Sequence, residues 1–373
     1  MMASKSERTG AVDRRGFLKA GILAGGLTAV AAGAAGRKDP AEAGRLFDHG
    51  QGSPPHSEHG PAGTVGTVDS AANGFDPHAM LHDWDFGRVS TLPGGQTLRE
   101  YEITASDKEI EVAPGVFFPA WVYNGRVPGP SLRAIEGDRI RIDFINVGSH
   151  PHTIHFHGIH SAAMDGVPGV GAGVIEPGDR TVYEFDAFPM GCHLYHCHSL
   201  PLKRHIHKGL YGAFIVDPDP NRYSGEEVAI ARSRNHQFAE NQEVNEMVMV
   251  MNAFDTNFDG ENEIYAVNTV AFAYANPPIQ IRRDQLQRLY LINIIEFDPI
   301  NSFHLHANFF DYYDHGTTLQ PTLKTVDTIM QAQAQRGILE FSFEGFEPGM
   351  YMFHAHVAEF AELGWMGFFD VVE

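Results

Sequence analysis

Cysteine is almost absent from this chain of 373 residues, which has two, Cys192 and Cys197. Both lie on one predicted strand, five positions apart. Side chains alternate between the two faces of a strand, so these thiols are expected on opposite faces. A disulfide between them is therefore not expected. The fold must be held together without a disulfide framework.

Positive charge is scarce as well. There are 27 Lys and Arg against 47 Asp and Glu, which gives a formal net charge of −20. Such a chain repels nucleic acid and anionic membrane surfaces, and we expect neither as a partner. Averaged over the whole protein, its field favours cationic or neutral small molecules.

Long apolar runs are missing beyond residue 36. No later segment reaches the roughly 18 apolar residues that a membrane-spanning helix requires, so the mature protein is expected to be soluble. Before that point, Asp13-Arg14-Arg15-Gly16-Phe17-Leu18-Lys19 precedes an Ala- and Gly-rich run. This pattern resembles a bacterial twin-arginine signal rather than a membrane anchor. We predict a signal peptide over 1–36 and export to the periplasm or the outside of the cell.

The remaining chain divides into four parts by composition. Residues 37–95 show no sustained period and predict a flexible N-terminal arm. Short alternating runs bounded by Gly, Pro and Asn then predict β-sandwich domains over 96–220 and 246–373, joined by a polar linker over 221–245. We therefore expect an all-β protein with two Greek-key sandwiches.

Two smaller patterns in the second block are interpreted as structural. The alternating methionines at 247, 249 and 251 indicate one face of a strand rather than a metal-binding tract. Asp255-Thr256-Asn257-Phe258-Asp259-Gly260 is similar to the start of a calcium loop. Position 12 of that loop is Ala266, where a bidentate Glu is required, so a hairpin turn is expected.

The two blocks form a degenerate repeat that carries four His-x-His pairs. On a strand, both imidazoles of such a pair lie on one face. The eight imidazoles are enough for three metal ions with three, three and two protein ligands. The pairs are His155 and His157, His196 and His198, His304 and His306, and His354 and His356.

A second set of residues occurs in the first block alone. Cys197 points to the face opposite His196 and His198, and together with His152 and His205 it has the composition of a blue-copper electron-transfer site. The family resemblance described next favours these histidines over their neighbours His150 and His207, because their spacing from the other motifs matches that of the family. In the second block the matching positions hold Asn301 for His152, Ala355 for Cys197, Phe360 for His205 and Trp365 for Leu210.

These motifs resemble multicopper oxidases built from cupredoxin domains. The resemblance rests on His-x-x-His-x-His-Gly at 152–158, His-Cys-His at 196–198 and Tyr-Asn-Gly-x-x-Pro-Gly-Pro at 123–130, and covers about residues 98–373. It is closest to two-domain, laccase-like bacterial members with the blue copper in the first domain. It implies four copper ions per subunit. Type 1 copper would take His152, Cys197 and His205, with Leu210 axial and non-ligating; type 2 would take His155 and His304; the type 3 pair would take His157, His196, His198, His306, His354 and His356.

The resemblance also implies a reaction and an assembly. Phenols or aromatic amines, as small-molecule reductants, would donate single electrons at the type 1 site, and Cys197 would relay them through its neighbouring histidines to reduce dioxygen to water. Leu210 in place of a weak axial donor should raise the potential. Asp165 is the preferred acid for proton supply, with a turn role as the alternative and Glu359 as a weaker candidate. The implied assembly is a head-to-tail homotrimer with clusters between subunits.

Three other functions stay open. A copper nitrite reductase is another two-domain trimer, but it needs only a three-histidine type 2 site and usually has methionine where Leu210 stands. A metal oxidase acting on Cu(I), Fe(II) or Mn(II) would use the same ligands. A copper carrier without catalysis would consume no oxygen.

Overall fold

The computed structural model describes residues 66–238 and 244–373. The predicted signal peptide and the first part of the arm lie outside these ranges. In the described residues, no helix has the length and apolar character needed to cross a membrane.

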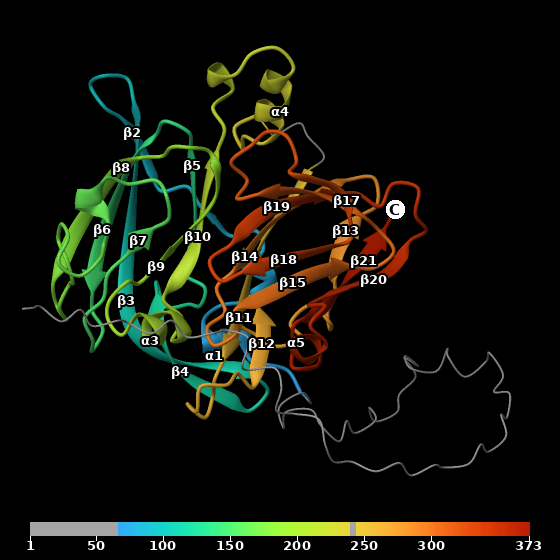
Figure 1. The fold of residues 1–373 in the computed structure, drawn as a ribbon, viewed down its shortest axis with the longest axis horizontal. Helices are drawn as coiled ribbons and strands as arrows, with labels where there is room; N and C mark the ends of the chain where they lie inside the picture. Colours follow the sequence, from blue (N-terminus) through green and yellow to red (C-terminus); the bar gives the residue numbers. More distant parts are fainter. Residues whose placement is uncertain (1–65, 239–243) are drawn as a thin grey trace, which may run out of the picture. The chain divides into compact units, whose positions relative to one another are not determined.

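The first half of the described chain, domain 1, contains two sheets (Figure 1, blue to green). In one, the strand order is β1 (Trp84–Asp85), β5 (Ser131–Ile135), β10 (Tyr211–Asp217), β9 (Gly191–His196) and β7 (His155–Phe156). In the other it is β2 (Arg88–Thr91), β3 (Thr97–Ala113), β6 (Arg139–Asn146) and β8 (Arg180–Asp186), with β4 (Val116–Tyr123) also paired to β3. Apolar side chains from both sheets pack into one core, which includes Ile142, Phe156, Tyr195 and Phe214.

Domain 2 repeats this arrangement (Figure 1, orange to red). One sheet has the order β12 (Ile264–Val267), β11 (Val244–Phe254), β14 (Leu286–Asn293), β19 (Arg336–Phe341), β16 (Phe310–Asp314) and β17 (Leu323–Val326). The other has β13 (Ile279–Arg282), β21 (Met366–Val372), β20 (Gly349–His354), β15 (Ile300–Leu305) and β18 (Thr328–Ala332). The predicted all-β fold class with cupredoxin-like domains is confirmed.

Strand β11 is buried on both faces, because it belongs to two cores. Its residues Met247, Met249 and Met251 enter the core of domain 2. The intervening Val248 and Val250 enter a second core, shared with domain 1 side chains such as those of β4 and β10. The methionines are thus one face of a strand, as predicted, and the valines help to join the two domains.

Short helices complete the described chain: α1 (Ser70–Asn73), α2 (Pro77–Met80), η2 (Ala162–Met164), α3 (Leu202–His207), η3 (Pro220–Arg222), α4 (Glu227–Ser233) and α5 (Ala358–Glu362). The part of the predicted arm that is described, from residue 66, is not loosely packed. Asp76 caps α2 with Pro77 in its first turn, and Met80 and Leu81 are buried. The sequence lacked a repeating period here because the four elements are short: α1 and α2 bury one and two side chains, and β1 and β2 bury none.

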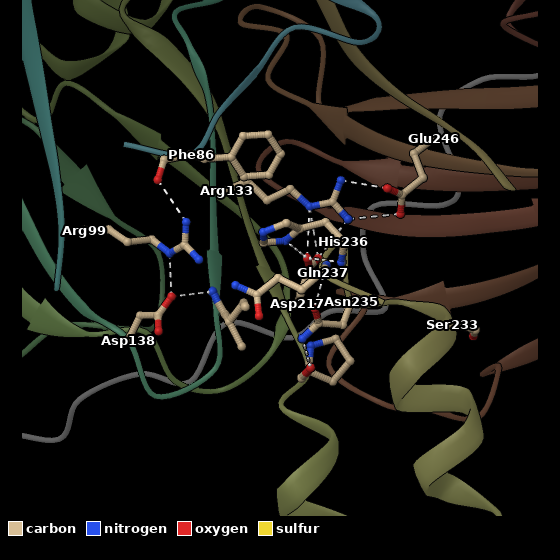
Figure 2. A network of polar contacts seen from close by, with 12 residues as sticks. Phe86, Arg99, Arg133, Asp138, Asp217, Ser233, Asn235, His236, Gln237 and Glu246 are labelled. Carbon is tan, nitrogen blue, oxygen red and sulfur yellow. Dashed lines mark hydrogen bonds and ion pairs between the residues drawn. The ribbon is translucent and has the colours of Figure 1, made fainter. Parts of the chain in front are cut away.

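The segment predicted as a linker also has structure, since it contains α4 and the end of η3. Beside it lies a network of buried ion pairs (Figure 2). The Arg133 guanidinium contacts Asp217 at 3.0 Å and Glu246 at 2.7 Å. Asp217 also accepts a hydrogen bond from His236 Nδ1 at 2.6 Å, and Glu246 contacts Arg288 at 3.1 Å. Removing one member of such a buried set is costly, so this network ties both domains to the segment between them.

Candidate metal centre

His152, Cys197 and His205 come together in the interior of domain 1. Cys197 Sγ lies 3.3 Å from Nδ1 of His205 and 3.9 Å from Nδ1 of His152, and the two Nδ1 atoms are 3.2 Å apart. All three side chains are buried. Two Nδ1 atoms and one sulfur thus face a common point, as a blue-copper donor set requires.

The protonation chemistry of this triad fits a bound metal ion. Burial, together with the neighbouring His205, lowers the pKa of His152 to about 3, and burial lowers that of His205 to about 4. Burial also raises the pKa of the Cys197 thiol. Neutral imidazoles keep a lone pair for a metal, and a metal ion is the natural replacement for the thiol proton in such a site.

The neighbouring histidines that the sequence left as alternatives, His150 and His207, are not part of this cluster. His207 Nε2 accepts a hydrogen bond from the backbone N–H of Asp255 at 3.0 Å. His150 contacts Ser149 Oγ at 2.8 Å, and its side chain is partly exposed. Leu210 is fully buried in the same core as Cys197, and its backbone carbonyl accepts from the N–H of Cys197.

Domain 2 has the same backbone at the matching point but no ligands. The N–H of Ala355 donates to the carbonyl of Trp365, as Cys197 does to Leu210, and Trp365 N–H donates to Phe360. The side chains of Ala355, Phe360 and Trp365 are buried in the apolar core. Asn301, Ala355 and Phe360 therefore stand where domain 1 has its triad, and the Trp365 indole takes the place of Leu210.

A second histidine cluster lies at the adjacent ends of β7 and β9. The Nε2 atoms of His157 and His196 are 2.9 Å apart, and the His155 ring is 5.3 Å from the rings of both His196 and His198. Nitrogens this close require a proton or a metal ion between them, because their lone pairs repel. Burial lowers the pKa of His157 to about 2 and that of His196 to about 4, so both rings are neutral and keep a lone pair that a metal ion can use.

The tautomers of two of these rings are set by backbone carbonyls. Nδ1 of His155 donates to the Asp165 carbonyl at 2.8 Å, and Nδ1 of His196 donates to the Cys197 carbonyl at 2.8 Å. Each ring therefore keeps an unprotonated Nε2, the nitrogen that faces the cluster.

Domain 2 reproduces this cluster closely. His306 and His354 approach through their Nε2 atoms at 2.9 Å, and the His304 ring lies 5.3 Å from His354 and 5.2 Å from His356. Nδ1 of His304 lies 3.0 Å from the Asp327 carbonyl, as His155 does with Asp165. We call the two sets the domain 1 half-site (His155, His157, His196 and His198) and the domain 2 half-site (His304, His306, His354 and His356).

Each half-site draws its histidines from one domain. Within the described residues, no cluster of three potential metal ligands mixes the two sets. In the domain 2 half-site, His306 and His356 are exposed. The second His-x-His residues are held alike, because His198 N–H donates to Thr153 Oγ1 and His356 N–H donates to Ser302 Oγ, both at 2.8 Å.

Asp165 lies beside the domain 1 half-site, whereas Glu359 lies exposed on α5. The Asp165 carboxylate is 3.0 Å from His155 Nδ1 and 3.5 Å from His160 Nε2. It can therefore orient His155, and its role as a proton donor stays a prediction. Sequence reasoning missed Asp327, Thr153 and Ser302. The signal was present for the hydroxyls, because each follows directly on the two matched positions His152 and Asn301.

Tight packing fixes the strand that carries the ligands. Gly212 on β10 pairs with Tyr195 on β9, and a Cβ at Gly212 would lie 2.4 Å from the tyrosine ring. Gly367 stands in the same relation to Phe353, with a contact of 2.6 Å. Only glycine allows these aromatic rings to cross the neighbouring strand between the histidines and the core.

The two cysteines are free and buried in different cores, Cys192 in the shared core and Cys197 in that of domain 1. The predicted absence of a disulfide is confirmed.

The loop after β11 is a tight turn, in which Asp255 accepts from the N–H groups of Asp259 and Gly260. Asp255, Asp259 and Glu263 approach one another there, but Asp255 and Glu263 are already engaged by groups of the same loop.

Comparison with known proteins agrees with this geometry. Family models described as multicopper oxidase match residues 104–221 and 240–373. A crystal structure of a multicopper oxidase is 54% identical, with a TM-score of 0.74, and the match covers 82% of this chain and 100% of that one.

Similarity extends to longer proteins. A probable nitrite reductase-hydroxylamine oxidoreductase fusion protein of Kuenenia stuttgartiensis is 29% identical over 313 residues, 77% of this chain and 33% of that protein. Copper resistance protein A of Escherichia coli is 36% identical over 155 residues, 39% of this chain and 25% of that protein. The chain thus spans a third or less of the length of these two relatives.

Proposed function

The chain belongs to the multicopper oxidase family, and we propose that within it this protein is a laccase-like enzyme that oxidises phenols or aromatic amines and reduces dioxygen to water. The observation that carries the proposal is the pair of matching half-sites, one of which is joined through a single strand to the buried Cys197 triad. A simple copper carrier needs neither the duplication nor the connection.

The residues divide into two sites. His152, Cys197 and His205 would hold the type 1 copper, with Leu210 as an apolar axial neighbour. The two half-sites together would hold one type 2 and two type 3 ions, four copper ions per subunit in all. Bound copper supplies one-electron oxidation of the donor at the first site and reduction of dioxygen at the second.

Cys197 links the sites covalently. It points into the core of domain 1, while His196 and His198, its direct neighbours in the chain, face the half-site. Carbonyl hydrogen bonds orient the half-site rings before any metal binds, as for His196 Nδ1 and the Cys197 carbonyl. Preorganised ligands of this kind tune a metal site. The path between the two centres is short because Cys197 is bonded in the chain to His196 and His198.

The proposed assembly is a head-to-tail homotrimer. Each half-site supplies four imidazoles, and the exposure of His306 and His356 leaves the domain 2 half-site open to a partner. In a ring of identical subunits, the domain 1 half-site of one chain lies against the domain 2 half-site of the next. Such heterologous contacts can form a closed ring in which every half-site has a partner.

We further propose that the protein is exported by the twin-arginine route to the periplasm or beyond. The support is the Arg14-Arg15 motif and the apolar run after it. Export as a folded protein suits a chain whose ligands come from strands far apart in the sequence.

Oxygen uptake with a phenolic donor tests the function. Copper-loaded wild type should consume oxygen, Cys197→Ser should lose the blue colour and the turnover, and His354→Ala should keep the blue colour but lose turnover. His82→Ala, which removes a histidine outside the three clusters, is the matched control and should behave as wild type. Turnover with nitrite as the acceptor, and none with oxygen, would instead favour a nitrite reductase.

A further inference from the structure

A cavity of about 640 Å³ opens between helix α3 and the loop after β11. Helix α3 also carries His205. The walls combine two aromatic rings, Phe258 and Phe297, with three cationic side chains, Lys203, Arg204 and Lys208. The size suits one aromatic small molecule.

The three cations have no ion-pair partner among residues 66–238 and 244–373. Each instead lies near an aromatic ring. Lys203 Nζ is 4.0 Å from the centre of Phe297, and Lys208 Nζ is 5.1 Å from that of Phe258. In a chain with a net charge of −20, three unpaired cations around one cavity are a marked local reversal of sign.

The lack of a counter-ion is energetically unfavourable for Lys208 in particular. The residue is 6% exposed, and partial desolvation of an ammonium without a counter-ion is unfavourable. Burial and the neighbouring Arg204 lower its pKa to about 8, and Asp107 offsets this only in part. The group therefore still carries charge at neutral pH, and an anion in the cavity would compensate it.

The acidic residues on the opposite wall do not supply a counter-ion for Lys208. The Asp255 carboxylate accepts hydrogen bonds from the backbone of its own loop. Asp259 is exposed. Neither carboxylate forms an ion pair with Lys203, Arg204 or Lys208. The positive charge on the other wall is therefore not neutralised by these acids.

One residue, Trp121, lies between the cations of the cavity and the proposed type 1 site. The Trp121 ring lies 4.7 Å from that of His205 and 5.2 Å from that of His152. Two of the cavity's cations also lie near Trp121: the Arg204 guanidinium is 5.3 Å and Lys208 Nζ is 5.8 Å from the centre of its ring. A molecule held by these cations is therefore one aromatic ring away from the buried triad.

We infer that this cavity binds aromatic donors that carry a carboxylate or sulfonate, with Lys208 as the principal anion contact. The inference rests on the proposed oxidase function, because it names the class of donor. It also differs from the expectation set by net charge, which favours cationic or neutral reductants. The overall field is an average, whereas the donor meets the local charge of α3.

Equilibrium binding tests the anion preference without turnover. Trimethoxybenzoate, which has no phenol to oxidise, is compared with its neutral amide by titration calorimetry on the copper-loaded protein. The acid should bind wild type about tenfold more tightly than the amide, and Lys208→Met should remove about tenfold of its affinity. Lys324→Met, an exposed charge removed on β17, should leave the affinity unchanged. Lys203→Gln gives a smaller loss in the same direction and serves if Lys208→Met does not fold.

Oxygen uptake with syringate and with syringamide then separates the two claims. Higher kcat/KM for syringate in wild type, lost in Lys208→Met while syringamide turnover persists, supports the inference. Uptake with syringamide but equal binding of acid and amide overturns the anion preference and leaves the oxidase function standing. No uptake with either donor overturns the proposed function and the donor role of the cavity together, even if the anion still binds.

Discussion

The Nε2 atom of His157 lies 2.9 Å from the Nε2 atom of His196. His306 and His354 repeat this pair in domain 2 at the same distance. If the pairs complete each other between subunits, chains defective in different domains should complement. His157→Ala and His306→Ala should each be inactive alone, whereas co-expression of the two should restore about one quarter of wild-type activity, since a random ring forms that share of intact interfaces.

The control for complementation is a pair of variants in one half-site. Co-expressed His157→Ala and His196→Ala should stay inactive, because every ring then has a defective domain 1 half-site. Recovery in this control, or none with the first pair, would contradict clusters formed between subunits. The measurement is oxygen uptake per mole of purified oligomer.

Leu210 is expected to set the potential of the type 1 site. Leu210→Met keeps the volume of a fully buried side chain and offers a weak thioether donor to the metal. The potential should fall, because an added axial donor favours the oxidised ion. Spectroelectrochemical titration of the blue band measures it. An unchanged potential, with the fold intact, would show that Leu210 does not face the metal.

Thr153 and Ser302 should contribute equally to the two half-sites. Thr153→Val leaves the N–H of His198 without its acceptor, and Ser302→Ala does the same to His356. Each change should lower the free energy of unfolding by about 1–3 kcal/mol, measured by urea denaturation of the copper-free protein. Thr104→Val, which removes an exposed hydroxyl contact with Asn124, is the control and should change it by less than about 0.5 kcal/mol.

Glu246 should make stability depend on acid pH. The guanidinium groups of Arg133 and Arg288 hold its pKa well below the usual value of 4.5. A carboxyl whose pKa is depressed by folding stabilises the protein above its unfolded pKa, and this contribution is lost as pH falls from about 4.5 toward the folded pKa.

Glu246→Gln therefore should lower the free energy of unfolding at neutral pH by about 3 kcal/mol. The difference from wild type should shrink as pH falls below 4.5. Chemical denaturation across this pH range measures it. A difference that stays constant would mean that the charge of Glu246 plays no part. Glu100→Gln, which breaks an exposed pair with Arg88, should have little effect at any pH.

The sequence predicted the metal ligands best where they lie close together in the chain. Each His-x-His pair stays within three residues, so the alternation of a strand was enough to place both imidazoles on one face. Comparison of the two blocks also matched Leu210 with Trp365 and Cys197 with Ala355, and the backbone hydrogen bonds agree with both matches.

Features made by residues far apart in the chain could not be predicted in the same way. Asp327 reaches His304 from the bend between β17 and β18, and the cavity joins α3 to a loop about fifty residues later. Leu81 is buried although its neighbours show no period, because its partners include β11 of domain 2. Such contacts depend on topology, which local patterns do not contain.

Counting copper and electrons tests the central claim most directly. Copper-loaded protein is assayed for metal per chain, and the donor oxidised is compared with the oxygen consumed. The proposed sites predict about four copper ions per chain and about four donor electrons per dioxygen, with no free peroxide. About two copper ions per chain, without oxygen uptake, would contradict the paired half-sites as a dioxygen-reducing centre.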